Sequence, residues 1–194
     1  YMETDEKHNN YFVYFNFFVF SMLLLVMSSN FLVMFFGWEL VGLSSYLLIS
    51  FWSKKPAAAK AGNKAFILNR VGDFGFLVGL MIILNTFNTF DFYTVLKSSS
   101  DVPENTITLI TLFLLLGAFG KSAQFPLFSW LPDAMEGPTP ASALIHAATM
   151  VTAGVFMLVR ISPILQHSKI AGMVIISFGL LTALLAAFSA INQY

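Results

Sequence analysis

Long apolar stretches dominate the chain, and short polar segments separate them. A helix needs about 20 apolar residues to cross the hydrocarbon core of a bilayer, which is roughly 30 Å thick. Six stretches meet this requirement, and we predict a transmembrane helix at each: 11–28, 31–52, 65–87, 107–130, 140–161 and 170–191. The pattern therefore predicts an all-α fold, a polytopic bundle of membrane-spanning helices.

The polar joints alternate between the two faces of such a bundle, and lysines gather on one of them. Numbered from the N-terminus, the first face holds Lys7, Lys54, Lys55, Lys60 and Lys64, whereas the second holds Lys97, Arg160 and Lys169. This excess predicts that the first face lies inside. Residues 1–10 are expected to form a loop on that face, and residues 1–194 to form a single membrane domain.

Composition and charge exclude several classes of function. Of the residues, 57% are hydrophobic and 10% are charged, and 10 basic residues balance 10 acidic ones, so no nucleic-acid partner is expected. The chain has no cysteine, which excludes disulfides, thiolate zinc sites and cysteine-bound iron–sulfur clusters. It also lacks phosphate-binding glycine motifs, paired zinc-binding histidines and activated nucleophile motifs. We therefore expect no metal, no cofactor and no bond-making catalysis in this chain.

Glu39 and Lys121 are charged residues that lie deep inside predicted helices. A charge at the centre of a bilayer costs about 2.5 kcal/mol or more, so it must face protein or water. Glu39 lies in the middle of the second predicted helix, and Lys121 lies in the fourth. Pro126 lacks the N–H that would bond the carbonyl of Ser122, so the fourth helix should break beside Lys121. A broken helix that carries a lysine predicts a polar interior.

A histidine in the fifth predicted helix adds a third ionisable group. It belongs to a polar stripe, expected on one helix face, of Ser142, His146, Thr149 and Thr152. By helix rise, Glu39, Lys121 and His146 lie at depths of roughly 20, 14 and 9 Å from the inner face. Such a series suits a proton relay, because a carboxylate stabilises a charged lysine, its departure favours proton release, and histidine titrates near neutral pH.

Structural roles are the alternative for each of these residues. Glu39 and Lys121 could form an ion pair that only holds helices together, and His146 could be a satisfied contact between helices. Arg70 and Asp73, three residues apart in the third predicted helix, would form an ion pair within that helix. Buried ion pairs rarely stabilise a protein more than apolar side chains do, which favours a function for Glu39 and Lys121. Packing or interface roles are expected for Trp38, Trp52 and Trp130.

Several motifs resemble those of the antiporter-like subunits of respiratory complex I. They are Gly37 to Leu40, Asn69 to Asp73, Gly120 to Pro126, Trp130 to Pro140 and His146 to Met150. The resemblance extends over nearly the whole chain, as one antiporter-like repeat plus one helix. It implies a proton channel in which Glu39, Lys121 and His146 form the relay, and it places Arg70 and Asp73 at functional positions too.

The same resemblance implies the setting of the chain. Flavin, iron–sulfur clusters and quinone are expected in partner subunits, and other membrane-arm subunits and lipids are the expected partners. The expected location is the mitochondrial inner membrane, or alternatively a bacterial plasma membrane. Because family members resemble a pair of inverted repeats with further helices, we expect this chain to be a fragment of a larger proton-translocating subunit. A separate chain would supply the missing helices.

The leading hypothesis is proton translocation by a non-redox subunit of an H⁺-translocating NADH:ubiquinone oxidoreductase. A subunit of a multisubunit cation/proton antiporter, which shares these motifs, is the first alternative. A structural remnant that only fills the membrane arm is the second. Co-purification with quinone-reducing subunits would favour the leading hypothesis, and a dry interior between Glu39 and His146 would favour the remnant.

Overall fold

The computed structural model describes residues 2–3 and 5–191, most of which are helical. Six helical segments are long and apolar enough to cross a membrane. They are α1 (His8–Val26), α2 (Phe31–Ile49), α3 (Pro56–Phe87), α5 (Glu104–Lys121), the series Thr139–Arg160 and α10 (Lys169–Ile191). The predicted all-α membrane bundle is therefore confirmed.

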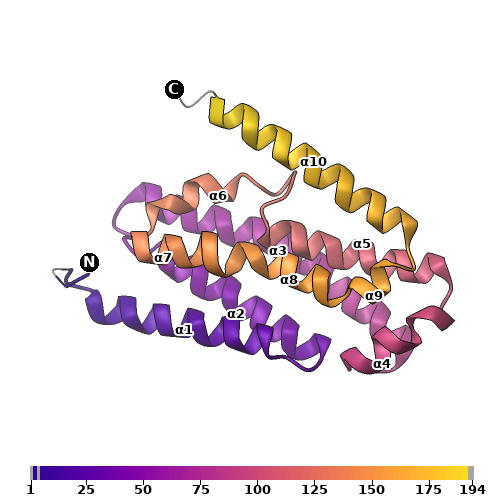
Figure 1. Cartoon of the computed structure of the whole chain (residues 1–194). Helices are drawn as coiled ribbons and strands as arrows, with labels where there is room; N and C mark the ends of the chain where they lie inside the picture. Colours follow the sequence, from indigo (N-terminus) through magenta and orange to yellow (C-terminus); the bar gives the residue numbers. More distant parts are fainter. Residues whose placement is uncertain (1, 4, 192–194) are drawn as a thin grey trace.

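Shorter elements join or interrupt these spans. They are α4 (Phe92–Lys97), η1 (Ser98–Asp101), α6 (Trp130–Asp133), η2 (Ala134–Glu136), α7 (Thr139–Ala143), the π-helical turn η3 (Leu144–Ala148), α8 (Met150–Arg160) and α9 (Ser162–Leu165). α5 packs against both α3 and α8 in the middle of the bundle, with α1 and α2 on one side and α10 on the other (Figure 1). Two spans are thus interrupted: one where α5 ends, and one between α7 and α8.

Several helix boundaries differ from the prediction. α1 begins at His8, so residues 8–10 are helical and do not belong to the expected loop. α3 begins at Pro56, well before residue 65. Proline favours the first position of a helix, and the alanines that follow favour its interior. The segment was not predicted as helix because its lysines lower its mean hydropathy. α5 ends at Lys121 because the helix is interrupted after this residue.

Polar contacts at both ends of the bundle agree with the predicted faces. Lys64 Nζ lies 2.7 Å from Asp133 Oδ2, which joins α3 to α6 on the first face. On the second face, the Arg160 guanidinium donates to the carbonyl oxygens of Val26, at 3.0 Å, and Ser28, at 2.5 Å. The guanidinium therefore caps the C-terminal end of α1, where the last main-chain carbonyls lack partners within the helix.

The core lies between α2, α3 and α5, whereas α10 lies apart from it. Trp38 and Phe76 are fully buried and meet edge to face, with ring centroids 5.1 Å apart. α10 contacts α5, α9 and the irregular segment after α5, where the Phe125 N–H donates to the Thr182 hydroxyl at 3.0 Å. The remaining surface of α10 is apolar and exposed. Lipid or further protein must cover it in a membrane.

Candidate functional site

The centre of the candidate site is a buried group of three side chains from three helices. Asp73 lies in the middle of α3 and Lys121 is the last residue of α5, and their side chains are 4% and 0% exposed. The Lys121 ammonium lies 3.8 Å from Asp73 Oδ2. The indole N–H of Trp38, from α2, donates to Asp73 Oδ1 at 2.7 Å. The carboxylate therefore joins α2, α3 and α5 in one polar contact.

Glycines make room for this group. A Cβ atom on Gly42 of α2 would lie 2.7 Å from Lys121 Nζ, and one on Gly72 of α3 would lie 3.0 Å from the Leu116 carbonyl oxygen of α5. Both distances are shorter than an optimal contact of about 3.5–4.0 Å. A side chain at Gly42 would displace the ammonium, and one at Gly72 would push α3 away from α5.

A second ion pair lies nearby, at the surface of the bundle. Arg70 of α3 and Glu39 of α2 form a salt bridge, and their side chains are 44% and 19% exposed. The Arg70 guanidinium also lies 4.8 Å from the centre of the Phe66 ring. This surface belongs to membrane-spanning helices, so another protein segment or water has to cover the charged pair.

These pairings correct two expectations. Arg70 and Asp73 do not form the expected ion pair within α3, because Arg70 pairs with α2 while Asp73 faces α5. The partner of Lys121 is Asp73, and Glu39 is paired with Arg70 instead. The physical reason is the same in both cases. Neighbouring helices offer a charge of opposite sign at close range to each side chain, and a partner on the same helix would leave the lysine unpaired in the core.

The backbone leaves the helical path directly after Lys121, as the nearby proline predicts (Figure 1). The carbonyl of Ser122, which the proline leaves without a helical partner, accepts from the Gln124 side-chain amide at 3.1 Å. The carbonyl of Gly120 accepts from the indole N–H of Trp130 at 3.0 Å. The freed carbonyls therefore have partners inside the protein, which is the condition for a broken helix at membrane depth.

His146 lies in the second interrupted span. It belongs to the π-helical turn Leu144–Ala148, and α8 begins only after Thr149, whose φ of −140° and ψ of −65° are not helical. A π turn contains an extra residue, which rotates the residues that follow it. The predicted polar stripe is therefore interrupted after His146. The hydroxyls of Thr149 and Thr152 donate to carbonyls of their own segment.

Buried polar atoms that form no hydrogen bond lie close to the break. Within residues 2–3 and 5–191, Lys121 Nζ, Asn69 Oδ1 and both ring nitrogens of His146 form no hydrogen bond. The main chain of Asn69 packs against Gly120, next to Lys121. Trp130 bonds to Gly120, and its ring centroid lies 6.3 Å from that of His146. Buried atoms of this kind are normally hydrogen-bonded to protein or to ordered water.

Three residues of the site were not identified from the sequence. Trp38 was expected to be a packing residue, although a buried indole N–H requires an acceptor and so indicated a polar neighbour. Gly42 lies one turn after Trp38, and a glycine within an apolar helix was a usable signal of close approach. Asn69 lies one turn before Asp73, on the same face of α3, so it could have been assigned to the same site.

Comparison with known proteins relates the chain to a defined family. Residues 28–194 match the family model described as NADH:quinone oxidoreductase/Mrp antiporter, TM. The chain is 53% identical over 193 residues to NADH-ubiquinone oxidoreductase chain 5 of Rhizopus stolonifer, which covers 100% of this chain and 30% of the relative. It is 51% identical over 203 residues to NADH-quinone oxidoreductase subunit L of Neisseria meningitidis, which covers 97% of this chain and 30% of the relative.

A solved structure has the same fold. A chain in the structure of the Mrp complex from Dietzia sp. DQ12-45-1b superimposes with a TM-score of 0.88 at 31% sequence identity. The match covers 93% of this chain and 20% of the other. The chain therefore spans less than a third of the length of the relatives described here.

Proposed function

Because the chain belongs to the NADH:quinone oxidoreductase/Mrp antiporter transmembrane family, we propose that it transfers protons as a subunit of the membrane arm of an NADH:ubiquinone oxidoreductase. It is a multi-pass inner-membrane protein. The proposal places it in the mitochondrial inner membrane as a non-redox subunit, with flavin, iron–sulfur clusters and quinone in its partners. The observation that carries the proposal is the fully buried Lys121 ammonium, which lies beside Asp73 at a helix break.

A relay requires a group that gains and loses a proton without leaving the protein. While Asp73 lies beside it, Lys121 keeps its proton, because the carboxylate offsets the cost of a buried positive charge. If the two groups separate by a few ångströms, the ammonium is left in an apolar core and its proton is driven out. Trp38 holds Asp73 from α2, so a shift of α2 against α5 would change the separation.

His146, beyond the helix break, is the proposed acceptor of the proton. It would pass from Lys121 Nζ to a water molecule and then to one ring nitrogen of His146, which could release a proton from the other nitrogen. Both ring nitrogens lack hydrogen-bond partners within the described residues, and so does the side-chain oxygen Oδ1 of Asn69, whose main chain packs against Gly120. Waters bonded to these atoms would satisfy them and would also connect Lys121 with His146.

The pair formed by Glu39 and Arg70 suits a coupling role. Glu39 follows Trp38 directly on α2, and Arg70 lies one turn before Asp73 on α3, so both polar contacts join the same two helices. A change of charge at the outer pair would therefore alter the field at Asp73 and the packing of α2 on α3. Because the outer pair is partly exposed at membrane depth, we infer that another membrane-arm subunit covers it.

The helices described here correspond to only part of the matched relatives. The relatives are more than three times as long as the segment matched here, since it covers 30% of each. We propose that helices corresponding to the rest of these relatives pack against the exposed surface of α10 and complete the path. A map of the intact complex should show further helices in contact with α10, and lipid over that whole surface would contradict the proposal.

A high-resolution map of the intact complex tests the relay. We expect ordered waters that bond to Lys121 Nζ, to Asn69 Oδ1 and to a ring nitrogen of His146. A dry interior, with apolar side chains packed between Lys121 and His146, would overturn the proposal and favour a purely structural role. Asn69 provides an internal check, because its side-chain oxygen Oδ1 should bond to one of these waters.

The similarity to the Mrp complex supports a second candidate function, a subunit of a cation/proton antiporter. The two functions differ in their partners. Purification of the chain together with quinone-reducing subunits would support the first function. A membrane complex without redox groups that exchanges cations for protons would support the second.

A further inference from the structure

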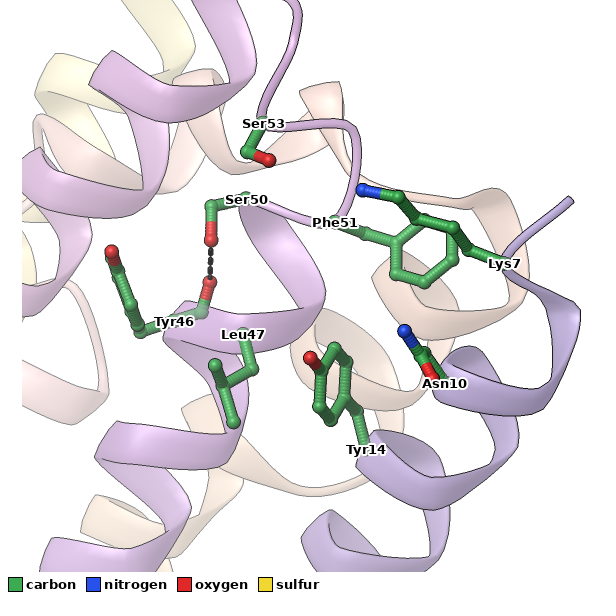
Figure 2. A pocket seen from close by; sticks show the side chains of 8 residues that line it. All are labelled: Lys7, Asn10, Tyr14, Tyr46, Leu47, Ser50, Phe51 and Ser53. Carbon is green, nitrogen blue, oxygen red and sulfur yellow. Dashed lines mark hydrogen bonds between the residues drawn. The ribbon is translucent and has the colours of Figure 1, made fainter.

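A polar pocket of about 220 Å³ opens between the start of α1 and the end of α2. It is distinct from the site described above. Lys7 and Asn10 lie at the start of α1, Tyr14 lies one turn further along, and Ser53 belongs to the turn that follows α2 (Figure 2). The pocket lies on the lysine-rich face of the bundle. It is therefore expected at the boundary between the membrane and the inner aqueous phase.

The pocket is lined by hydrogen-bond donors that are not engaged elsewhere. In the described part of the chain, the side chains of Lys7, Asn10, Tyr14 and Ser53 form no hydrogen bond and no salt bridge. Figure 2 shows the Lys7 ammonium and the Ser53 hydroxyl pointing toward one another across the opening. Together with one positive charge and no carboxylate in the lining, these donors match the acceptor oxygens of a phosphate group.

Two carboxylates, Asp5 and Glu6, lie outside the pocket and line an adjoining hollow. Asp5 accepts from the Trp52 indole at 2.9 Å and from the Lys7 main-chain N–H at 2.8 Å. These hydrogen bonds hold the pKa of the Asp5 carboxyl below its usual range, with the larger effect from the indole and the smaller one from the main-chain N–H. The Asp5 carboxylate is therefore charged and bonded at neutral pH. Lys54 and Lys55 in the adjoining turn balance the charges of Asp5 and Glu6, which leaves Lys7 as the charge in the lining of the pocket.

An apolar stripe leads from the pocket into the depth of the membrane. Leu47 lines the pocket, and Leu43, Leu40 and Phe36 follow it along α2 at spacings that place them on one helix face. The pair formed by Glu39 and Arg70 borders this stripe on one side. Leu43 is 39% exposed and Phe36 is 59% exposed. A phosphate-binding pocket that continues as an apolar stripe fits a molecule with a charged head and a hydrocarbon chain.

We propose that this pocket binds the phosphate of an anionic phospholipid, whose acyl chain lies along the stripe on α2. Lys7 pairs with the phosphate, and the side chains of Asn10, Tyr14 and Ser53 donate hydrogen bonds to its oxygens. Free phosphate shares the head-group chemistry but has no acyl chain to contact the stripe, so a binding experiment can distinguish the two ligands. The proposal does not depend on the proton relay.

Lipid binding to the delipidated, assembled complex in a neutral detergent tests the proposal. Phosphatidylglycerol, phosphatidylcholine and inorganic phosphate are added in parallel. The shift in the thermal midpoint and the bound phospholipid, measured by native mass spectrometry, are recorded for each. We expect phosphatidylglycerol to raise the midpoint more than phosphatidylcholine and inorganic phosphate to leave it unchanged. Lys7→Gln should weaken phosphatidylglycerol binding about fivefold, the contribution typical of one lysine near an anionic membrane surface.

Two further variants make the result specific. Lys60→Gln is the matched control, because Lys60 is an exposed lysine on the same face that does not line the pocket. It should bind phosphatidylglycerol as the unmodified complex does. Tyr14→Phe removes one donor without changing the packing and should also weaken binding. Equal binding in Lys7→Gln and Lys60→Gln, an equal midpoint shift with inorganic phosphate, or no lipid effect at all would each overturn the proposal.

Discussion

Replacing Asp73 by asparagine should destabilise the protein strongly, because it leaves the buried Lys121 ammonium without a counter-charge. At the observed separation of 3.8 Å, opposite unit charges attract by about 4 kcal/mol at an effective dielectric constant of about 20. Removing one member of a buried pair typically costs about 3–5 kcal/mol, whereas replacing both members is close to neutral. We therefore expect Asp73→Asn to be costly and the double variant Asp73→Asn with Lys121→Met to recover most of the loss.

The thermal midpoint of the assembled complex in lipid nanodiscs measures this coupling for the two single variants and the double variant. The pair Lys64–Asp133 provides a control, because its atoms are closer, at 2.7 Å, but its side chains are 41% and 47% exposed. Water screens such a pair, so its coupling should be only about 0.2–1 kcal/mol. If the losses at Asp73 and Lys121 add to within about 0.5 kcal/mol, the two residues are not coupled and the reasoning is refuted.

Three further variants test other parts of the structure. Gly42→Ala should displace the Lys121 ammonium and lower the rate of proton transfer in reconstituted vesicles, whereas Gly179→Ala, where the space around the glycine is open, should leave the rate unchanged. Arg160→Met should lower the thermal midpoint by the equivalent of about 1–3 kcal/mol, because two main-chain carbonyls at the end of α1 lose their donor; an unchanged midpoint would contradict this assignment. Hydrogen bonds from the first turn of α4 hold the pKa of Asp91 below its usual range, so its stabilising effect should be present at neutral pH and should disappear as the pH falls from about 4 through the lowered value. Asp91→Asn should remove that part of the pH dependence of the midpoint, and an identical pH profile would contradict it.

The membrane spans and the helix break could be predicted because each depends on local sequence. The bilayer imposes a minimum apolar length, and the six spans follow from it. The break after Lys121 follows from a proline, which removes a main-chain donor wherever the fold places it. The start of α3 was missed because its first turns carry lysines, and these are tolerated where a helix extends beyond the apolar core.

The pairing of charges could not be predicted, because it depends on which helix faces which. Arg70 and Asp73 are close in sequence, so an ion pair within α3 was a reasonable expectation. Their partners, Glu39 and Lys121, are specified only by the packing of α2, α3 and α5. The π-helical turn at His146 was missed for a different reason. No single residue type specifies an extra residue in a helical turn, and the regular helical spacing used in the prediction assumes there is none.

The central claim, that Lys121 carries protons, is tested most directly by the number of protons moved per NADH oxidised. Vesicles that contain the assembled complex with Lys121→Met should move fewer protons per NADH than the unmodified complex. Those with Lys64→Met, which removes an exposed lysine of the neighbouring helix, should match the unmodified value. The ratio is independent of how much complex assembles. An unchanged ratio in Lys121→Met would contradict the account.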